Sequence, residues 1–266
     1  MKSGAHHKGT LHAGAYMLDG HEMYCQTYGA QLGDGPTHAG TKDAQVTYIV
    51  DKWGTTTSAV QAADVYLATN SLAGSAAFNS DYAGYLNQLP DRGARVKAML
   101  AEATRLAGPW KVTVTAPKAV PGMMVLASVT VTSASGAPVP GVRPTVHGVG
   151  AVVSTATVTN GAGLASVEVR PSMLTYTLSA TISSPGSTAW TNTPTAGHQV
   201  LVGAGPNATV NGSACATVCP VSADVHIHAQ CDDKGNHQVD ITFTAENLRG
   251  STKALCPSAG TPQSST

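Results

Sequence analysis

The spacing of apolar residues divides the chain into a helical part and a strand-rich part. In the helical part, apolar residues recur every three or four positions, which predicts helices. The first apolar stripe consists of Val46, Ile49, Val50 and Trp53. It predicts a helix with Thr41 as N-cap and Gly54 as stop. Further helices are predicted over 58–70, around 82–89, and from Asp91 to the Gly108-Pro109 pair.

After Trp110 the apolar period changes from about 3.6 to about two, which is the period of a strand. Apolar and polar residues alternate over 110–116, 125–131, 167–169 and 176–182. Turn signals such as Asn160-Gly161 separate these runs. Short strands at this density predict a β-sandwich, with His198–Val202 as its last strand. A further alternating strand at 239–243 lies in a small region that begins at about residue 204.

These patterns predict a multidomain chain: an α+β domain over 1–108, an all-β sandwich over 109–203, and a small disulfide-containing β region with a C-terminal linker over 204–266. The hairpin sequence at 159–169 is similar to the bacterial Ig-like domains of surface adhesins. That resemblance implies an Ig-like sandwich.

Composition indicates a protein of the cell exterior. Charged residues make up 11% of the chain, against about 25% in average globular proteins. Lys and Arg together equal Asp and Glu together, at 15 each, and no basic cluster indicates a nucleic-acid partner. No apolar run is long enough to span a membrane. We therefore expect a secreted or cell-wall surface protein. Neither a signal peptide nor an anchor is visible in the sequence, so we expect it to be a piece of a longer protein.

The cysteines fall into two groups. Cys25 stands alone near the start, whereas the other four lie far downstream, at Cys215, Cys219, Cys231 and Cys256. Four cysteines in a secreted chain predict two disulfides, for which three connectivities are open. Zinc binding by these cysteines with His226 and His228 is the alternative, and we predict no metal site.

Gln61 lies on the helix predicted over 58–70, which is apolar around nearly its whole circumference. Such a helix is usually buried, and a buried carboxamide without partners costs about 1–3 kcal/mol. A capping box with Ser58 is one explanation of Gln61. Condensation with a nearby thiol is the other.

Two segments carry a resemblance to a known family. Residues 14–25, which end in Tyr24-Cys25, resemble the start of the thioester domains of Gram-positive surface adhesins. Val60-Gln61-Ala62-Ala63 is similar to the Thr-Gln-X-Ala helix motif of those domains, although Val60 stands in place of Thr. The Cys–Gln separation is also shorter than is usual in the family. The resemblance spans about residues 10–107.

The resemblance implies an internal thioester between the Cys25 sulfur and the Gln61 acyl group. Val60 and Ala62 would support it, and Tyr24 would shield it from water. An amine or hydroxyl on a host or environmental surface protein or glycan would attack it, leaving a covalent bond to the target. This is single-use capture, so we expect neither an enzyme nor a cofactor. His21 and His38 are the nearest candidate bases in the sequence.

Two alternatives remain open at this stage. A secreted cysteine hydrolase acting on cell-wall peptide would use Cys25 as nucleophile with His38 or His21 as base. A structural surface stalk without chemistry would explain residues 109–266, but not the preceding helical domain with its unpaired cysteine.

Overall fold

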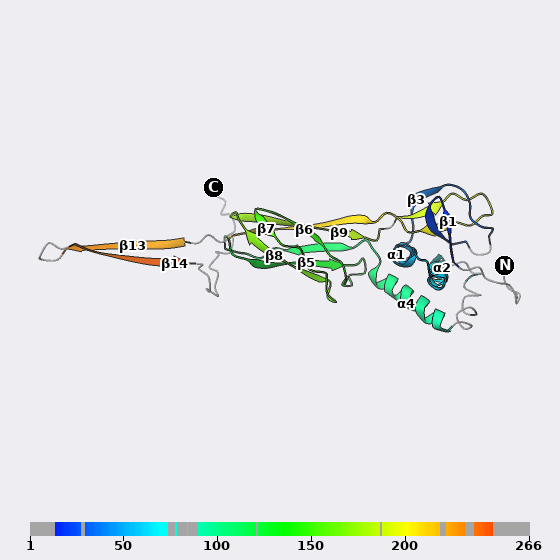
Figure 1. Ribbon diagram of the computed structural model, residues 1–266, viewed down its shortest axis with the longest axis horizontal. Coiled ribbons are helices and arrows are strands. Elements are labelled where there is room, and N and C mark those ends of the chain that lie inside the picture. The colour runs from blue at the N-terminus through cyan, green and yellow to red at the C-terminus, as the bar shows by residue number, and fades with distance from the viewer. Residues whose placement is uncertain are drawn as a thin grey trace, which may run out of the picture.

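The structure, a computed structural model, describes residues 14–27, 30–73, 78, 84, 90–120, 122–186, 188–218, 222–231 and 237–246. It is mostly β, with antiparallel sheets and, in the described residues, three helices of defined bounds. The arrangement is elongated (Figure 1). The helices lie at one end, two layered sheets lie in the middle, and a two-stranded ribbon lies at the other end.

A five-stranded antiparallel sheet stands beside the helices, in the order β1-β2-β11-β10-β3. Its strands are β1 (Ala15–Leu18), β2 (His21–Cys25), β3 (Thr37–Thr41), β10 (Thr188–Asn192) and β11 (Leu201–Gly203). We call this sheet together with helices α1, α2 and α4 the head. Residues separated by more than 160 positions therefore share one sheet, because β11 pairs with β2 through Leu201 and Cys25.

Helix α1 (Ala44–Trp53) confirms the first apolar stripe, and its apolar face is buried. Its N-cap is Asp43 rather than the predicted Thr41. The Asp43 carboxylate accepts hydrogen bonds from the amides of Gln45 and Val46 at 2.9 and 3.3 Å. Asp43 satisfies amides that a helix start leaves without intrahelical partners, and Gly54 ends the helix as predicted.

Helices α2 (Ala59–Ala73) and α4 (Pro90–Leu106) also lie where the sequence predicts helices. Asp64 of α2 is 1% exposed and faces the Nε atoms of Arg92 and Arg95 on α4, at 3.2 and 2.5 Å. These two ion pairs hold the two helices together. The helix predicted around 82–89 lies outside the described residues, apart from Gly84.

Two antiparallel sheets form the middle of the molecule. One has the order β4-β5-β8-β7 and the other β12-β9-β6. Their bounds are Lys111–Thr115 (β4), Val125–Thr132 (β5), Thr145–Val149 (β6), Ala151–Val153 (β7), Leu164–Pro171 (β8), Thr175–Ser184 (β9) and Ala208–Thr217 (β12). Alternate residues are buried, as the period of two predicts; in β9 they are Tyr176, Leu178, Ala180 and Ile182. We call these two sheets the sandwich.

Strand pairing departs from the predicted domain limits in two places. The segment 188–203, predicted to belong to the sandwich, forms β10 and β11 of the head sheet. Residues 208–217, predicted to belong to the third region, form β12 and pair with β9 along its length. Within these two segments the sequence predicted a strand only at His198–Val202, so β10 and β12 were not predicted. The partners of both segments are non-local.

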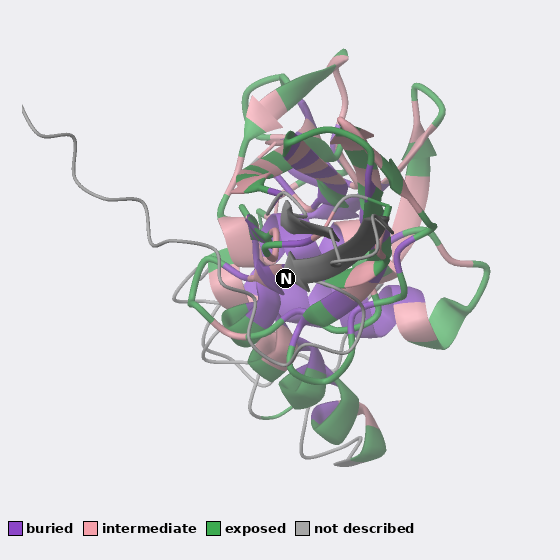
Figure 2. Ribbon diagram, turned by 90° about the vertical axis from the view of Figure 1, so that its left-hand side faces the viewer, coloured by how far each residue is buried: buried purple, intermediate pink, exposed green. Residues whose placement is uncertain are grey.

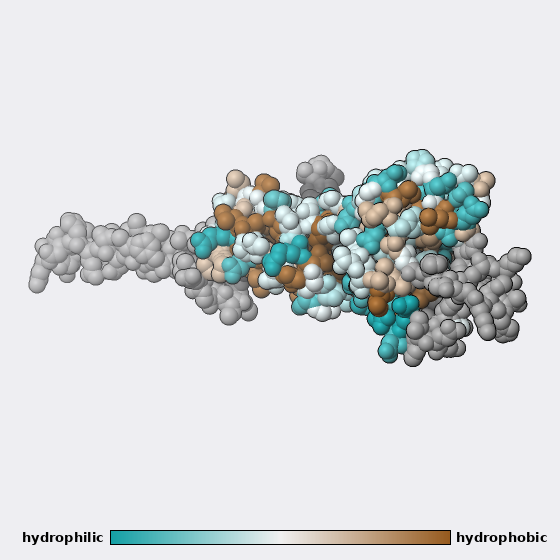
Figure 3. Space-filling view, turned by 45° about the vertical axis from the view of Figure 1, so that its right-hand side comes forward, coloured by the Kyte–Doolittle hydropathy of each residue, from teal (hydrophilic) through white to brown (hydrophobic). Residues whose placement is uncertain are grey.

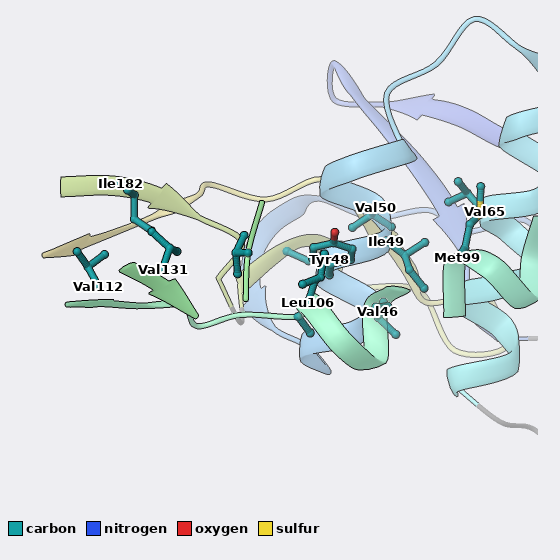
Figure 4. Close-up of a cluster of buried hydrophobic side chains, with 14 of the residues drawn as sticks. Val46, Tyr48, Ile49, Val50, Val65, Met99, Leu106, Val112, Val131 and Ile182 are labelled. Carbon is teal, nitrogen blue, oxygen red and sulfur yellow. The ribbon is translucent and has the colours of Figure 1, made fainter. Parts of the chain in front are cut away.

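The head and the sandwich meet at a hydrogen-bonded junction. The end of α4 is capped by the sandwich, since the hydroxyls of Ser133 and Ser135 donate to the Arg105 carbonyl at 2.7 and 2.8 Å. The Trp110 indole donates to the Leu106 carbonyl at 2.7 Å. Figure 4 shows Tyr48 and Leu106 of the head between the other helix residues and the sandwich residues Val112, Val131 and Ile182. Buried residues are prominent in the middle of the view along the long axis (Figure 2).

Asp51 provides a pH-dependent contact near this junction. Its Oδ1 accepts a hydrogen bond from the Gly205 amide at 3.0 Å, and its Oδ2 is buried without a partner among the described residues. Burial raises the pKa of Asp51 from 3.8 to about 6, and the Gly205 bond offsets only part of that shift. The unfolded chain therefore ionises at a lower pH than the folded one.

Stability should fall as the pH rises from 3.8 to about 6, because the unfolded chain releases the Asp51 proton there while the folded head still holds it. For Asp51→Asn, which cannot ionise, we expect the Tm relative to wild type to increase as the pH rises from 3.8 to about 6 and to level off above that. Thermal unfolding of both proteins over this pH range measures the difference. A difference that does not change with pH would contradict the assignment.

The remaining strands, β13 (Ser222–Cys231) and β14 (His237–Glu246), pair with each other in a separate two-stranded sheet. The strand predicted at 239–243 lies within β14. None of the helices among the described residues has the length and apolar character needed to cross a bilayer. Figure 3 shows hydrophobic and hydrophilic residues intermixed over one face of the head and sandwich.

Candidate functional site

Cys25 is the last residue of β2 and is buried, with 8% exposure. The side-chain amide of Asn70 on α2 donates to the Cys25 carbonyl at 2.5 Å. Burial raises the pKa of the Cys25 thiol to about 11. The thiol is therefore almost entirely protonated near neutral pH and is shielded from bulk water.

Tyr24 occupies the opposite face of the strand. Successive strand residues point to opposite sides of a sheet, and the Tyr24 hydroxyl reaches the Gly54 carbonyl at the end of α1, at 2.6 Å. Tyr24 is fully buried, and burial raises the pKa of its hydroxyl. It anchors the sheet to the α1–α2 connection and does not lie over the thiol.

Gln61 lies near the start of α2, as predicted. Its backbone amide donates to the Ser58 hydroxyl at 3.3 Å, which is one half of a capping box. Its side-chain amide donates to the Trp53 carbonyl at 2.9 Å. Gln61 and its exposed neighbour Val60 line a cavity of about 410 Å³ between α2 and α4, whereas Ala62 is buried.

The structure does not bring Cys25 and Gln61 together. Asn70, which contacts Cys25, follows Gln61 by nine residues on the same helix. At about 100° and 1.5 Å per residue, the two side chains point in opposite directions and are about 13 Å apart along the helix axis. Gln61 also donates a hydrogen bond to the carbonyl of Trp53, which precedes Gly54. The Gly54 carbonyl accepts from Tyr24, whose side chain lies on the face of the sheet opposite Cys25.

Gln199 is the carboxamide that lies next to Cys25. Leu201 of β11 is the direct partner of Cys25, and the alignment continues through a hydrogen bond from the Gln26 amide to the Val200 carbonyl at 2.8 Å. Gln199 lies just before β11 and precedes Leu201 by two residues, which is the spacing that places strand residues on one face. A diagonal pair of this kind lies about 7–8 Å apart between backbones, within reach of a long side chain. The Gln199 Oε1 atom is buried without a partner among the described residues.

Tyr16 completes the surroundings of the thiol. It pairs with Met23, so its side chain lies on the face of Met23 and Cys25. Its hydroxyl is buried, makes no hydrogen bond of good geometry among the described residues, and lies near enough to Cys25 to lower the pKa of the thiol. Burial raises the pKa of Tyr16 itself.

Gly33 is the fourth residue of the group, and it lies so close to its neighbours that no side chain fits at its position. A Cβ there would lie 2.6 Å from the Tyr16 hydroxyl, 2.7 Å from the Gln199 carbonyl oxygen and 2.7 Å from Leu201. Atoms from β1, the 30–36 loop and the chain before β11 therefore meet at one point. We call Tyr16, Cys25, Gly33 and Gln199 the Cys25 cluster.

Neither predicted histidine belongs to this cluster. His21 lies four residues before Cys25 on β2, about 13 Å away along the strand, and stacks on Trp190 with ring centroids 4.0 Å apart. His38 is on β3, three strands from β2 and so about 14 Å away. Its Nδ1 lies 3.5 Å from the Thr193 hydroxyl. The structure therefore places neither His21 nor His38 beside Cys25, so the catalytic pairs predicted for a hydrolase are not formed.

The downstream cysteines are only partly described. Cys215 is a free, exposed thiol on β12, with its sulfur 3.2 Å from the Thr177 hydroxyl. The prediction that it takes part in a disulfide is therefore not met. Cys219 and Cys256 lie outside the described residues, as does the side chain of Cys231 at the end of β13. In the described part of the chain, no group of three His, Cys, Asp or Glu side chains is arranged to hold a metal ion.

Sequence reasoning missed Tyr16 and Gln199. Tyr16 lies in a stretch whose alternation is loose, and Gln199 precedes three apolar residues, Val200 to Val202, that read as an ordinary buried strand. The one local signal is a carboxamide directly before such a strand. That signal is common, and it acquires meaning only once β11 is known to pair with β2.

Comparison with known proteins adds little to this description. No family model and no curated protein matches the chain. Among solved structures, the chain is similar to the Bacillus anthracis TIE protein, with 11% identity and a TM-score of 0.45 over 85% of this chain and 50% of that one. The chain thus spans about half the length of that structure. A similarity of this size does not by itself establish a family or an activity.

Proposed function

We propose that the head forms an internal thioester between the Cys25 sulfur and the Gln199 side-chain carbonyl, and that this bond captures a nucleophile on a target surface. One observation carries the proposal: Cys25 is a buried thiol in β2, and Gln199, whose side-chain oxygen is buried without a partner among the described residues, lies two residues before Leu201, the direct partner of Cys25. The sequence resemblance of residues 14–25 to thioester domains supports the same chemistry for Cys25. Gln199 takes the role that the resemblance implies for Gln61.

Formation of the bond is a condensation. The Cys25 sulfur adds to the Gln199 side-chain carbonyl carbon, the carbon–nitrogen bond breaks, and the amide nitrogen leaves as ammonia with the thiol proton. An amide is a weak electrophile, and a thiol of pKa about 11 is little ionised near neutral pH. The reaction therefore depends on holding the two groups in contact, which converts an encounter between separate molecules into an intramolecular step.

The same burial would preserve the product. A thioester hydrolyses when water reaches its carbonyl, and Cys25 is buried. An amine that enters the site attacks the carbonyl carbon, the carbon–sulfur bond breaks, and Gln199 becomes linked to the amine while Cys25 recovers its thiol. Each molecule reacts once, so the protein is a covalent binder and not an enzyme.

The shape of the molecule suits display of this site. The head lies at one end, with the sandwich and the β13–β14 ribbon extending away from it (Figure 1). A rod of this kind would hold the Cys25 cluster away from the point at which the protein is attached. The partner we propose is a surface protein or glycan that carries an amine or hydroxyl. We propose that this protein is secreted or held at the cell wall, where it can reach that target.

Intact mass spectrometry tests the proposal. We expect the purified chain to be about 17 Da lighter than its sequence, because one ammonia has left. Incubation with methylamine should then attach one amine to Gln199 and make Cys25 reactive to iodoacetamide, as peptide mapping can show. Cys25→Ala should have full mass and take up no methylamine, whereas the matched control Cys215→Ala should behave as wild type. Full mass in the wild type, with Cys25 already alkylated, would exclude a thioester.

A further inference from the structure

The geometry points to Tyr16 as the hydrogen-bond donor that stabilises the Cys25 sulfur whenever its bond to Gln199 forms or breaks. This inference rests on the proposed thioester. It assigns a catalytic residue to a site in which neither of the predicted histidines lies.

The placement of Tyr16 follows from register and burial. Tyr16 pairs with Met23, two residues from Cys25, so both side chains lie on one face of neighbouring strands. The Tyr16 hydroxyl is buried at the contact of Gly33 with Gln199. It therefore lies beside the Gln199 backbone, on the face of the sheet that carries Cys25.

Tyr16 is the side-chain donor whose proximity lowers the pKa of the Cys25 thiol. The nearby carboxamide of Asn70 bonds to the Cys25 carbonyl and the Tyr66 carbonyl. The groups that lower the pKa of the Cys25 thiol are the Tyr16 hydroxyl and the backbone of Cys25 itself. Loss of the hydroxyl would leave a developing thiolate without a side-chain partner in a dry environment.

The hydroxyl acts by donating a hydrogen bond, without giving up its proton. During capture, the amine nitrogen attacks the Gln199 carbonyl carbon, and the electron pair of the carbon–sulfur bond moves to sulfur. The Tyr16 O–H stabilises that charge until a proton from the amine reaches the sulfur, so atoms and charge balance. Burial raises the pKa of Tyr16, which keeps the hydroxyl neutral and able to donate. Hydrogen bonds to charged groups in buried sites are strong enough to change rates by orders of magnitude.

A Tyr16→Phe substitution in the full chain tests this role, because it removes only the hydroxyl. Two quantities are measured: the fraction of molecules that carry the mass loss, and the rate of methylamine incorporation as a function of pH. We expect incorporation to be about 10- to 100-fold slower than in wild type. In a Gln199→Ala background, where the thiol is free, adding Tyr16→Phe should move the appearance of the Cys25 thiolate absorbance to higher pH, which a purely structural role would not cause.

Tyr24→Phe is the matched control. It also removes a buried tyrosine hydroxyl from the head sheet, but one that bonds to the Gly54 carbonyl on the opposite face. It should leave the incorporation rate unchanged. If Tyr16→Phe prevents folding, Tyr16→Gln, which keeps a donor, is the second variant. A measurable rate there supports the role, and a folded Tyr16→Gln protein without any incorporation contradicts it.

The outcomes separate this inference from the proposed function. A Tyr16→Phe protein that carries the mass loss and reacts at the wild-type rate at every pH overturns the role of Tyr16 and leaves the thioester intact. Equal slowing by Tyr24→Phe would mean that the effect is structural, and also overturns it. A wild type of full mass overturns both.

Discussion

Replacing Gln199 with alanine is expected to abolish the mass loss and all methylamine incorporation, whereas replacing Gln61 leaves both unchanged. Of these two carboxamides, Gln199 is the one that the β2–β11 register brings near Cys25, since it lies two residues before Leu201. Gln61 bonds to Trp53 at the other end of α2 and points away from Cys25. Intact mass with and without methylamine reads out both variants, and Gln199→Ala should regain about 17 Da beyond the change that the substitution itself makes.

Gln199→Glu tests whether the thioester is lost only because the smaller alanine side chain disturbs the fold. It keeps the size of the side chain but presents a carboxylate, which a thiol does not attack, so it should also lack the thioester while remaining folded. The reverse pattern, in which Gln61→Ala loses the thioester and Gln199→Ala retains it, would return the acyl donor to α2. That outcome would also require α2 to turn relative to β2 before the bond forms.

Asp64→Ala is expected to destabilise the head by about 3 kcal/mol. Asp64 is 1% exposed and faces the guanidinium groups of Arg92 and Arg95 across the α2–α4 contact. Its removal leaves two positive charges at a partly buried interface without their counter-charge. Both arginines retain some access to water, which places the effect near the lower end of the range for broken buried pairs.

Urea unfolding followed by tryptophan fluorescence measures this loss, because Trp53 and Trp190 both lie in the head. Lys97→Ala, an exposed position on α4, is the control and should change the free energy of unfolding by about 0.5 kcal/mol or less. A similar small effect for Asp64→Ala would mean that apolar packing alone holds the two helices together.

Local sequence was sufficient to predict most elements and their type. The apolar stripe of α1, the Gly108-Pro109 stop after α4 and the alternation in β9 each reflect how one segment divides its own residues between core and solvent. Burial in the structure follows those periods, because a helix or a strand presents its faces according to its own geometry. The isolation of Cys25 from the other cysteines was likewise visible in the sequence, and the structure shows this thiol free and buried.

The order of residues along the chain is therefore enough to define the elements and one partner of the proposed bond. Strand pairing had to come from the three-dimensional fold: β10 and β11 return to the head, β12 joins β9, and Gln199 comes to lie beside Cys25. The alternation of a strand predicts which of its faces is buried, but it does not identify the strand with which it pairs. Any exposed sheet edge of matching register can be that partner. The second partner of the proposed bond follows from that pairing, because Gln199 comes near Cys25 only when β11 lies against β2.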